Sequence, residues 1–315
     1  MWIKNYIVGV GVGGTTVQCG IFTREGELLE KWEIPTRTEE NGKNILPDSA
    51  ETVLAHMKAH GIKKEEVLGI GVGVPGPVDD NGVTPVAVNL HWGRVDIAGE
   101  MQRLTGISAR AANDANAAAL GEMWKGGGAG HRNLVLVTIG TGIGGGIIVN
   151  ERIVAGAHGA GGEIGHAHVD DTITDPCNCG NCGCLEQVTS ATGIVRLARE
   201  ELARGDEPSV LRDRRVSAKA VFDAVRQQDP LALRVAEKFG MYLGKALALF
   251  ACVCDPEIIV IGGGVSKAGP ILIDFIEKNY RKYAFSACRD ARFELARLGN
   301  EAGIYGGARL VLQSR

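Results

Sequence analysis

Four of the eight cysteines are crowded into one short segment, and they are Cys177, Cys179, Cys182 and Cys184. Two histidines, His166 and His168, stand a few residues before them. Thiolates and imidazole at such spacing are the usual ligands of tetrahedral zinc, and a closed shell of four ligands is typical of a structural site. Without a metal, clustered exposed thiols would be reactive. The spacing therefore predicts zinc, but it leaves open whether the shell is all four cysteines or three of them completed by His166 or His168.

A second group of residues that could bind a ligand is the glycine cluster in "YIVGVGVGGTTVQCGIF" (Tyr6–Phe22). It satisfies the G-x-G-x-x-G pattern of dinucleotide-binding folds, and "GTGIGG" (Gly140–Gly145) satisfies it again. That pattern requires a helix after the glycines, because the pyrophosphate binds at the N-terminus of that helix. Strand-like sequence follows both clusters, so the dinucleotide interpretation fails. Two hairpin turns whose N–H and hydroxyl groups face phosphate oxygens explain the pattern better.

The elements that carry these turns occur twice along the chain. "IVGVGVGGT" (Ile7–Thr15) aligns with "LVTIGTGIGGG" (Leu136–Gly146), and each copy reads as strand, glycine turn, strand. A third glycine turn lies in "IIVIGGGVS" (Ile258–Ser266). This repetition predicts a duplicated α/β fold with a cleft between its two lobes.

Hydrophobic periodicity and turn residues place the other elements. The segment "KGGGAG" (Lys125–Gly130) reads as a hinge or linker. The sequence predicts strands at 6–10, 17–22, 28–34 and 107–111, and a buried strand in 67–79 that runs into a Pro/Gly loop. It predicts helices at about 44–60, 96–104, 113–124, 191–203, 217–228, 231–253 and 270–283, with a last helix near the end.

The composition is that of an ordinary globular protein, with 45% hydrophobic and 23% charged residues. The net charge of −3 does not suggest a nucleic-acid or membrane partner. No apolar run approaches the ~20 residues of a spanning helix, so a cytoplasmic location is expected.

Several motifs spread over essentially the whole chain together resemble the ROK family, which groups bacterial sugar kinases with sugar-responsive repressors. Among these proteins the chain looks closest to the ATP-dependent glucokinases. The Glu-x-Gly-His motif and the C-x-C-G-x-x-G-C-x-E signature are the most specific parts of the match. The matching segments are "GGTT" (Gly13–Thr16), "GVPGPVD" (Gly73–Asp79), "NDANAAALGE" (Asn113–Glu122), "TIGTGIGGG" (Thr138–Gly146), "GGEIGH" (Gly161–His166), "CNCGNCGCLEQ" (Cys177–Gln187), "VIGGGVS" (Val260–Ser266) and "LGNEAGIYGGA" (Leu298–Ala308).

The resemblance implies a ribonuclease H-like fold of the actin/hexokinase type, duplicated, with two lobes and a central cleft. The small N-terminal lobe would hold residues 1–112 and about 304–315, so that the C-terminal helix returns to it. The large lobe, 113–303, would carry the sugar, zinc and adenosine sites. Family members are commonly dimers or tetramers, so a homodimer or homotetramer is expected.

The resemblance also implies roles for individual residues. Asp114 matches the catalytic base, which orients the sugar hydroxyl and takes its proton. From the sequence alone, Asn113 and Asp114 read as the N-cap and first-turn acid of a helix. The sugar-binding positions would be Asn89, Asn113, Asp114, Glu163, His166 and Glu186. ATP would be held by Gly13, Gly14, Thr15, Thr141, Gly142, Gly262, Gly263 and Gly264. The zinc ligands would be His166, Cys177, Cys179 and Cys184, with Cys182 as a spare thiol.

The expected reaction transfers the γ-phosphate of ATP, carried with Mg²⁺, to the 6-hydroxyl of glucose. Mannose, fructose, allose or N-acetylhexosamine are alternative substrates on the same scaffold. ROK repressors carry a helix-turn-helix before the first strand, but here that strand begins by about Asn5, which disfavours a repressor. A sugar-binding protein without catalysis is the remaining alternative.

One position departs from the family pattern. The family's opening motif is Asp-x-Gly-Gly-Thr, and Gly11 occupies the place of the aspartate, which is expected to position Mg²⁺ and the phosphates. We therefore expect normal sugar binding with phosphoryl transfer slowed about 10²–10³-fold, as when one electrostatic stabiliser is removed.

Overall fold

The structure is a computed structural model in which residues 4–313 are described. The chain divides into two compact units. The first comprises the chain up to Arg132, the segment Gly146–Gly162 and the chain from Leu298 onward, and the second comprises Asn133–Gly145 and Glu163–Arg297. The expected lobe boundary between residues 112 and 113 stays a prediction.

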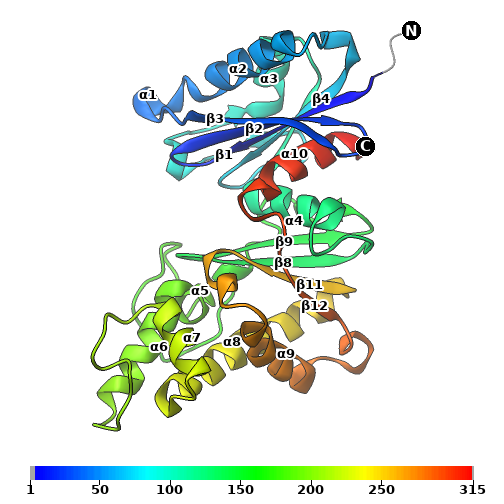
Figure 1. The fold of residues 1–315 in the computed structure, drawn as a ribbon. Helices are drawn as coiled ribbons and strands as arrows, with labels where there is room; N and C mark the ends of the chain where they lie inside the picture. The colour runs from blue at the N-terminus through cyan, green and yellow to red at the C-terminus, as the bar shows by residue number, and fades with distance from the viewer. Residues whose placement is uncertain (1–3, 314–315) are drawn as a thin grey trace. The chain divides into compact units, whose positions relative to one another are not determined.

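The first unit is built on a five-stranded sheet of order β3-β2-β1-β4-β7 (Figure 1). The first three strands form the predicted antiparallel meander, while β1, β4 and β7 run parallel. The strands are β1 (Tyr6–Val12), β2 (Thr16–Thr23), β3 (Leu28–Pro35), β4 (Val67–Val74) and β7 (Ala109–Asn113), and a separate pair is β5 (Val83–Thr84) with β6 (Val95–Asp96).

Helices cover both faces of this sheet because its strands are apolar on both sides. Val8 and Val10 pack into a core with α2 (Ile45–Ala59) and α3 (Ile97–Thr105). Ile7 belongs to a smaller core on the other face, with Ile304 and Ala308 of α10 (Ala302–Leu312). The remaining helices of the unit are α1 (Glu39–Gly42) and α4 (Asp114–Lys125).

Glycine permits the close approach of α10 to the sheet. A Cβ at Gly9 would lie 1.9 Å from the backbone oxygen of Ile304, and one at Gly71 would lie 1.8 Å from that of Gly307. No side chain fits at such distances, so these glycines are required by packing.

The second sheet has the order β10-β9-β8-β11-β12. It repeats the first one strand for strand, with an antiparallel β9–β10 pair at one end and parallel β8, β11 and β12. The predicted duplication is thus confirmed. The strands are β8 (Leu134–Ile139), β9 (Ile143–Val149), β10 (Arg152–Ile153), β11 (Ile258–Gly262) and β12 (Arg292–Leu295).

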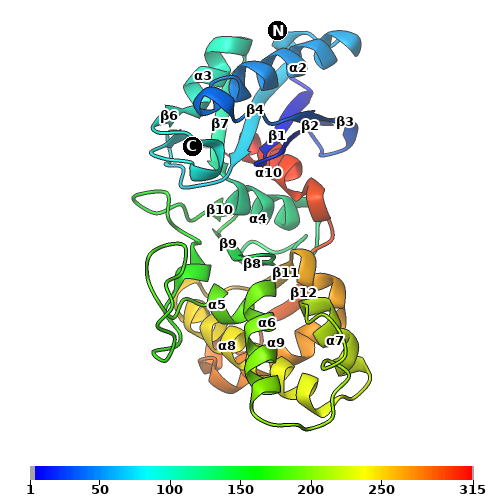
Figure 2. The same cartoon turned by 90° about the vertical axis from the view of Figure 1, so that its left-hand side faces the viewer.

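The long helix α8 (Pro230–Cys254) organises the helical part of the second unit, and it packs against α6, α7 and α9 (Figure 2). Asp229 caps it by accepting a hydrogen bond from the Ala232 N–H, and Pro230 fills the first helical position, where no N–H is needed. Even so, no helix within residues 4–313 is long and apolar enough to cross a membrane. The other helices are α5 (Glu186–Thr189), α6 (Ala191–Ala203), α7 (Ala218–Arg226) and α9 (Pro270–Tyr283).

The glycine segment after α4 ends close to the Arg132/Asn133 division, but it is a packed turn. Gly126–Gly128 are buried, and the Gly127 N–H donates to Oε2 of the buried Glu122 at 2.8 Å. The other carboxylate oxygen of Glu122 accepts from the Leu298 N–H at 2.9 Å. Glu122 therefore joins this turn to the segment that leads into α10.

Candidate active site and metal centre

A pocket of about 250 Å³ in the first unit brings the opening glycine turn together with Asp114. The turn contributes because β1 ends and β2 begins there, and Asp114 contributes because α4 begins directly after β7. All of these strands belong to one sheet. The lining residues are Gly11, Val12, Gly13, Thr16, Gln18, Gly73, Asp114, Asn300 and Gly303.

The backbone at Gly11 does not require glycine. A Cβ built there would meet its nearest neighbours, atoms of Gly303 and Ile304, at 3.8 Å, which is ordinary van der Waals contact. The strand geometry and the space thus accept a side chain at this position.

The turn between β1 and β2 is held by backbone and side-chain hydrogen bonds. The Gly13 N–H donates to the Thr16 oxygen at 2.9 Å, and the Thr36 hydroxyl donates to the Gly13 oxygen at 2.7 Å. Gly13, Gly14 and Thr15 are exposed. A Cβ at Gly14 would lie 4.0 Å from the backbone oxygen of Asn89, so this predicted sugar residue is near the turn.

Asn113 and Asp114 form the start of α4, as the sequence predicts. The Asn113 side-chain oxygen accepts from the N–H groups of Ala115 and Asn116 at 2.9 and 3.0 Å, and its Nδ2 donates to the Gly76 oxygen at 3.1 Å. Asp114 is exposed on the first turn, where the helix dipole favours an ionised carboxylate.

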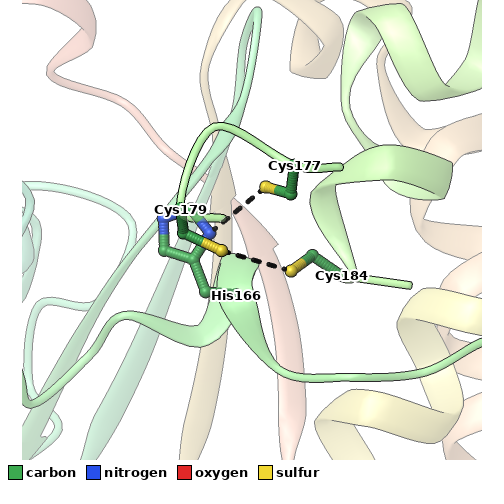
Figure 3. Close-up of side chains that lie close together, drawn as sticks. All are labelled: His166, Cys177, Cys179 and Cys184. Atoms are coloured by element: carbon green, nitrogen blue, oxygen red, sulfur yellow. Dashed lines mark hydrogen bonds between the residues drawn. The ribbon is translucent and has the colours of Figure 1, made fainter. Parts of the chain in front are cut away.

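In the second unit, one histidine and three cysteines converge. The ligand atoms of His166, Cys177, Cys179 and Cys184 all lie within 4.8 Å of one another (Figure 3). Cys179 Sγ is 3.6 Å from Cys184 Sγ, and Cys177 Sγ is 3.7 Å from His166 Nδ1. This donor set is the one a tetrahedral zinc site uses.

The two other candidate ligands point elsewhere. Cys182 Sγ donates to the Thr174 oxygen at 3.2 Å. The ring of His168 contacts the Cys182 backbone oxygen at 2.9 Å and Asp171 Oδ1 at 2.8 Å. Of the arrangements that the spacing left open, the structure thus brings together three cysteines with His166.

The thiols of this cluster differ in acidity. Burial raises the pKa of Cys177 to about 12, whereas the Asn181 N–H lowers the pKa of Cys179 by hydrogen bonding to its sulfur. Cys179 therefore offers the most accessible thiolate, the form that binds metal.

Glu186 links the cysteine cluster to the second glycine turn. Its Oε1 accepts from the Cys177 thiol at 2.9 Å, and its Oε2 accepts from the Ile143 N–H at 3.3 Å. A Cβ at Gly142 would lie 2.5 Å from Oε2, so the carboxylate lies directly against this glycine. A predicted sugar residue, a predicted metal ligand and a predicted phosphate turn thus meet at one side chain.

The chain matches the ROK family over residues 7–314. It belongs to the ROK family. It is 43% identical to a glucokinase from Halalkalibacterium halodurans, over 98% of this chain and 96% of that protein. A solved ROK family glucokinase from Streptomyces griseus, in complex with glucose and AMPPNP, is 31% identical, with a TM-score of 0.73 over 98% of this chain and 100% of that one. A ROK hexokinase from Thermus thermophilus is 31% identical, with a TM-score of 0.80 over 96% and 97% of the two chains.

The remaining ATP- and sugar-binding residues that the sequence predicts in this ROK protein lie at the ends of strands and beside one short helix. Gly263 has φ +83°, and a Cβ there would lie 2.5 Å from the Ile139 backbone, so the turn Gly262–Gly264 lies beside the end of β8. Glu163 is exposed and precedes the short helix that carries His166.

Several residues of the first pocket, Asn300 and Gly303 among them, were given no role from the sequence. Asn300 and Gly303 line it with Asp114, although only their motif, and no role, was identified from the sequence. Their place follows from the return of α10 to the first sheet of this ROK protein. That return is a tertiary contact without a local sequence signal.

Proposed function

We propose that this ROK protein is an ATP-dependent glucokinase that transfers the γ-phosphoryl group of ATP to the 6-hydroxyl of glucose. The observation that carries the proposal is the pocket in which Asp114 faces the glycine turn. The glucokinases among its relatives, and the glucose and AMPPNP complex of one of them, support the choice of substrates.

Asp114 acts as the general base in this proposal. Phosphoryl transfer to an alcohol needs little covalent chemistry from the protein, but the hydroxyl must be oriented and must lose its proton. An exposed carboxylate at a helix N-terminus is ionised at neutral pH and is able to accept that proton.

The phosphate groups are proposed to bind at glycine turns. In the first unit these are the N–H groups of Gly13 and Gly14 with Thr15, and in the second unit Thr141 with Gly142, and Gly262–Gly264. Backbone N–H groups at such turns form concave sites for anions.

The sugar is proposed to bind through amides and carboxylates, which form paired hydrogen bonds to neighbouring hydroxyls. The residues are Asn89 and Asn113 with Asp114 in the first unit, and Glu163, His166 and Glu186 in the second. A site of this kind discriminates between hexoses because a misplaced hydroxyl leaves a buried group unpaired.

We infer a structural zinc site at His166, Cys177, Cys179 and Cys184. The convergence of three sulfur atoms and one nitrogen fits four-coordinate Zn²⁺, which there would crosslink the segment 166–184. His166 would be fixed in place as a ligand. The Ile143 N–H would still hold Glu186, whereas the Cys177 thiol would no longer donate to it, because a zinc-bound thiolate has no proton.

Mg²⁺ is proposed to enter with ATP, and Gly11 leaves this site without the carboxylate that would help to position it.

The absence of a side chain at Gly11 also favours a second candidate function, a sugar-binding protein without catalysis. A coupled assay of ADP release with Mg-ATP across a panel of hexoses separates the two. Turnover on glucose above that on mannose, fructose, allose and N-acetylhexosamines supports the glucokinase. ATP hydrolysis that no sugar stimulates supports the alternative.

A homodimer or homotetramer is proposed from exposed apolar side chains on the second unit. Leu249 and Val253 lie one turn apart on α8 and are 67% and 88% exposed, and Phe285 is 64% exposed. Apolar surface of this kind favours contact with a second copy. Sedimentation equilibrium of the wild type and of Val253→Glu tests the assembly.

A further inference from the structure

Each of two glycine turns accepts a hydrogen bond from the hydroxyl of a threonine that lies outside the turn. In the first unit, the Thr36 hydroxyl donates to the Gly13 oxygen at 2.7 Å. In the second unit, the Thr192 hydroxyl donates to the Thr141 oxygen at 3.1 Å. We propose that Thr36 and Thr192 are positioning residues, which orient the peptide groups of these turns for binding the phosphate groups of ATP. This rests on the function proposed above, in which both turns bind phosphate.

Thr36 contacts the first turn through two of its groups. Besides the hydroxyl, its backbone N–H donates to the Thr15 oxygen at 2.9 Å. Thr36 directly follows β3, and β3 pairs with β2, which begins at the end of this turn. The sheet therefore brings Thr36 beside the turn, and two carbonyl oxygens of the turn are directed toward it.

The second turn is held in the same way, although by a helix. The Ala191 N–H donates to the Gly140 oxygen at 2.8 Å. The next residue, Thr192, supplies the hydroxyl, and both residues lie in the first turn of α6. The Thr192 hydroxyl is also 2.9 Å from that of the N-cap residue Ser190, which limits its rotation. Here again, one backbone N–H and one threonine hydroxyl bind two carbonyl oxygens of a glycine turn.

Fixing these carbonyl oxygens also fixes N–H groups of the turns. A trans peptide group is planar, so its C=O and N–H point in opposite directions. The peptide group of the Gly13 oxygen carries the Gly14 N–H, and that of the Thr141 oxygen carries the Gly142 N–H. Neither N–H donates to another residue within 4–313. Both are therefore directed away from the threonines and are available to bind an anion.

The glycines explain why the turns need such contacts. Glycine populates more backbone conformations than any other residue, so a glycine turn is flexible unless its peptide groups are held. The first turn contains two adjacent glycines, and glycines flank Thr141 in the second. A donor that is already oriented loses less freedom on binding, and this raises affinity. Loss of either threonine hydroxyl should therefore weaken ATP binding, while the backbone hydrogen bonds to the same turn remain.

Calorimetry with the ATP analogue AMPPNP tests the proposal on the full-length protein. Thr36→Val and Thr192→Val keep the shape of the side chain and lose the hydroxyl. Each is expected to weaken AMPPNP binding about 3- to 10-fold, the effect of one hydrogen bond. Thr36→Ser and Thr192→Ser keep the donor and should bind AMPPNP as the wild type does.

Thr23→Val is the matched control. It also removes a threonine hydroxyl that holds a turn, because Thr23 Oγ1 accepts from the Glu27 N–H at 3.2 Å between β2 and β3. That turn is not a proposed phosphate site, so AMPPNP affinity should be unchanged. Glucose affinity should be unchanged in all five variants, whereas a general loss of structure would lower it as well.

The proposal is overturned if Thr36→Val and Thr192→Val bind AMPPNP as the wild type does, or if the serine variants bind as weakly as the valine variants. It is also overturned if glucose affinity falls as far as AMPPNP affinity, or if the wild type does not bind AMPPNP. A wild type that binds AMPPNP but shows no glucose-dependent turnover of ATP would contradict the glucokinase function alone. The AMPPNP affinities of the variants would then still decide the role of the two threonines.

Discussion

Gly11 and Asp114 line the same pocket of the first unit, although they lie far apart in the sequence. Gly11 thus places no side chain beside the proposed catalytic base. A Cβ there would make only ordinary van der Waals contacts, so this position accepts a side chain without disturbing the surrounding fold.

Replacing Gly11 by aspartate should raise kcat. The nearest atoms to a new Cβ are 3.8 Å away, so the side chain fits without moving α10. A carboxylate there would help to position Mg-ATP, and we expect a gain of about 10²–10³-fold. Steady-state kinetics with glucose measure it, and Gly11→Asn is the control of equal size without charge. Equal rates for Gly11→Asp and the wild type would show that Gly11 is no defect.

Replacing Asp114 by asparagine should lower kcat by about 10²–10⁴-fold, the usual contribution of a general base. The amide keeps an oxygen that is able to accept from the Ala115 N–H, as the carboxylate does at 2.8 Å. Asn113 still caps the helix, so the variant should fold and calorimetry should still detect glucose binding. A variant with wild-type turnover would exclude Asp114 as the base.

Two neighbouring cysteines provide a matched test of the metal centre. Cys184→Ser should release zinc and weaken glucose binding, because the metal is proposed to hold His166 and the segment around Glu186. Cys182→Ser should change neither, since its thiol donates to the Thr174 oxygen outside the cluster. Metal analysis and calorimetry measure both quantities. Unchanged glucose affinity in zinc-free protein would separate the metal from the sugar site.

Gly9 and Gly11 lie two residues apart on β1 and should differ sharply in their tolerance of a methyl group. Gly9→Ala places a Cβ 1.9 Å from the Ile304 oxygen and should lower the free energy of unfolding by about 1–3 kcal/mol or more. Gly11→Ala should have a much smaller effect. Denaturant unfolding of the two variants compares them directly, and equal losses would contradict the packing of α10 described above.

Glu201 should make stability depend on pH in the acid range. Burial opposes its ionisation, but hydrogen bonds from Lys238 and Arg234 outweigh this and lower its pKa. A lowered folded-state pKa stabilises the protein above the unfolded value of about 4.3, and this stability is lost as the pH falls through the folded pKa. Glu201→Gln should therefore be destabilised at neutral pH, with a difference from wild type that shrinks under acid conditions. A difference that is constant with pH would rule out this origin.

Local pattern was sufficient to predict the hairpins, the helices and the duplication, because these depend on periodicity and on turn residues. It was not sufficient to separate Gly9 from Gly11, since both satisfy one glycine pattern and only the approach of α10 distinguishes them. The ligands of the predicted zinc site were likewise undecided from spacing alone, which allowed four cysteines or three cysteines with His166 or His168. The side chain of His168 is directed to Asp171 and Cys182, and such a choice depends on the folded loop.

The contacts of Glu30 with His56 and His60 have no signal in the sequence beyond the spacing of the two histidines. Glu30 joins them only because β3 lies beside α2 in the fold. Sites whose members come from different elements require the tertiary structure, whereas sites within one short segment, such as Cys177–Cys184, are visible in the sequence.

The return of α10 to the first sheet also determines when the first unit is able to finish folding during protein synthesis. The strands β1 to β4 are made early, yet the glycine-lined face that receives Ile304 and Ala308 stays uncovered until those residues have been translated. The first unit contains the residues that are translated first, but its core is completed only when α10 is made. Until then it exposes an apolar sheet face. Such surface is prone to aggregation, so we expect the nascent chain to depend on chaperones during elongation.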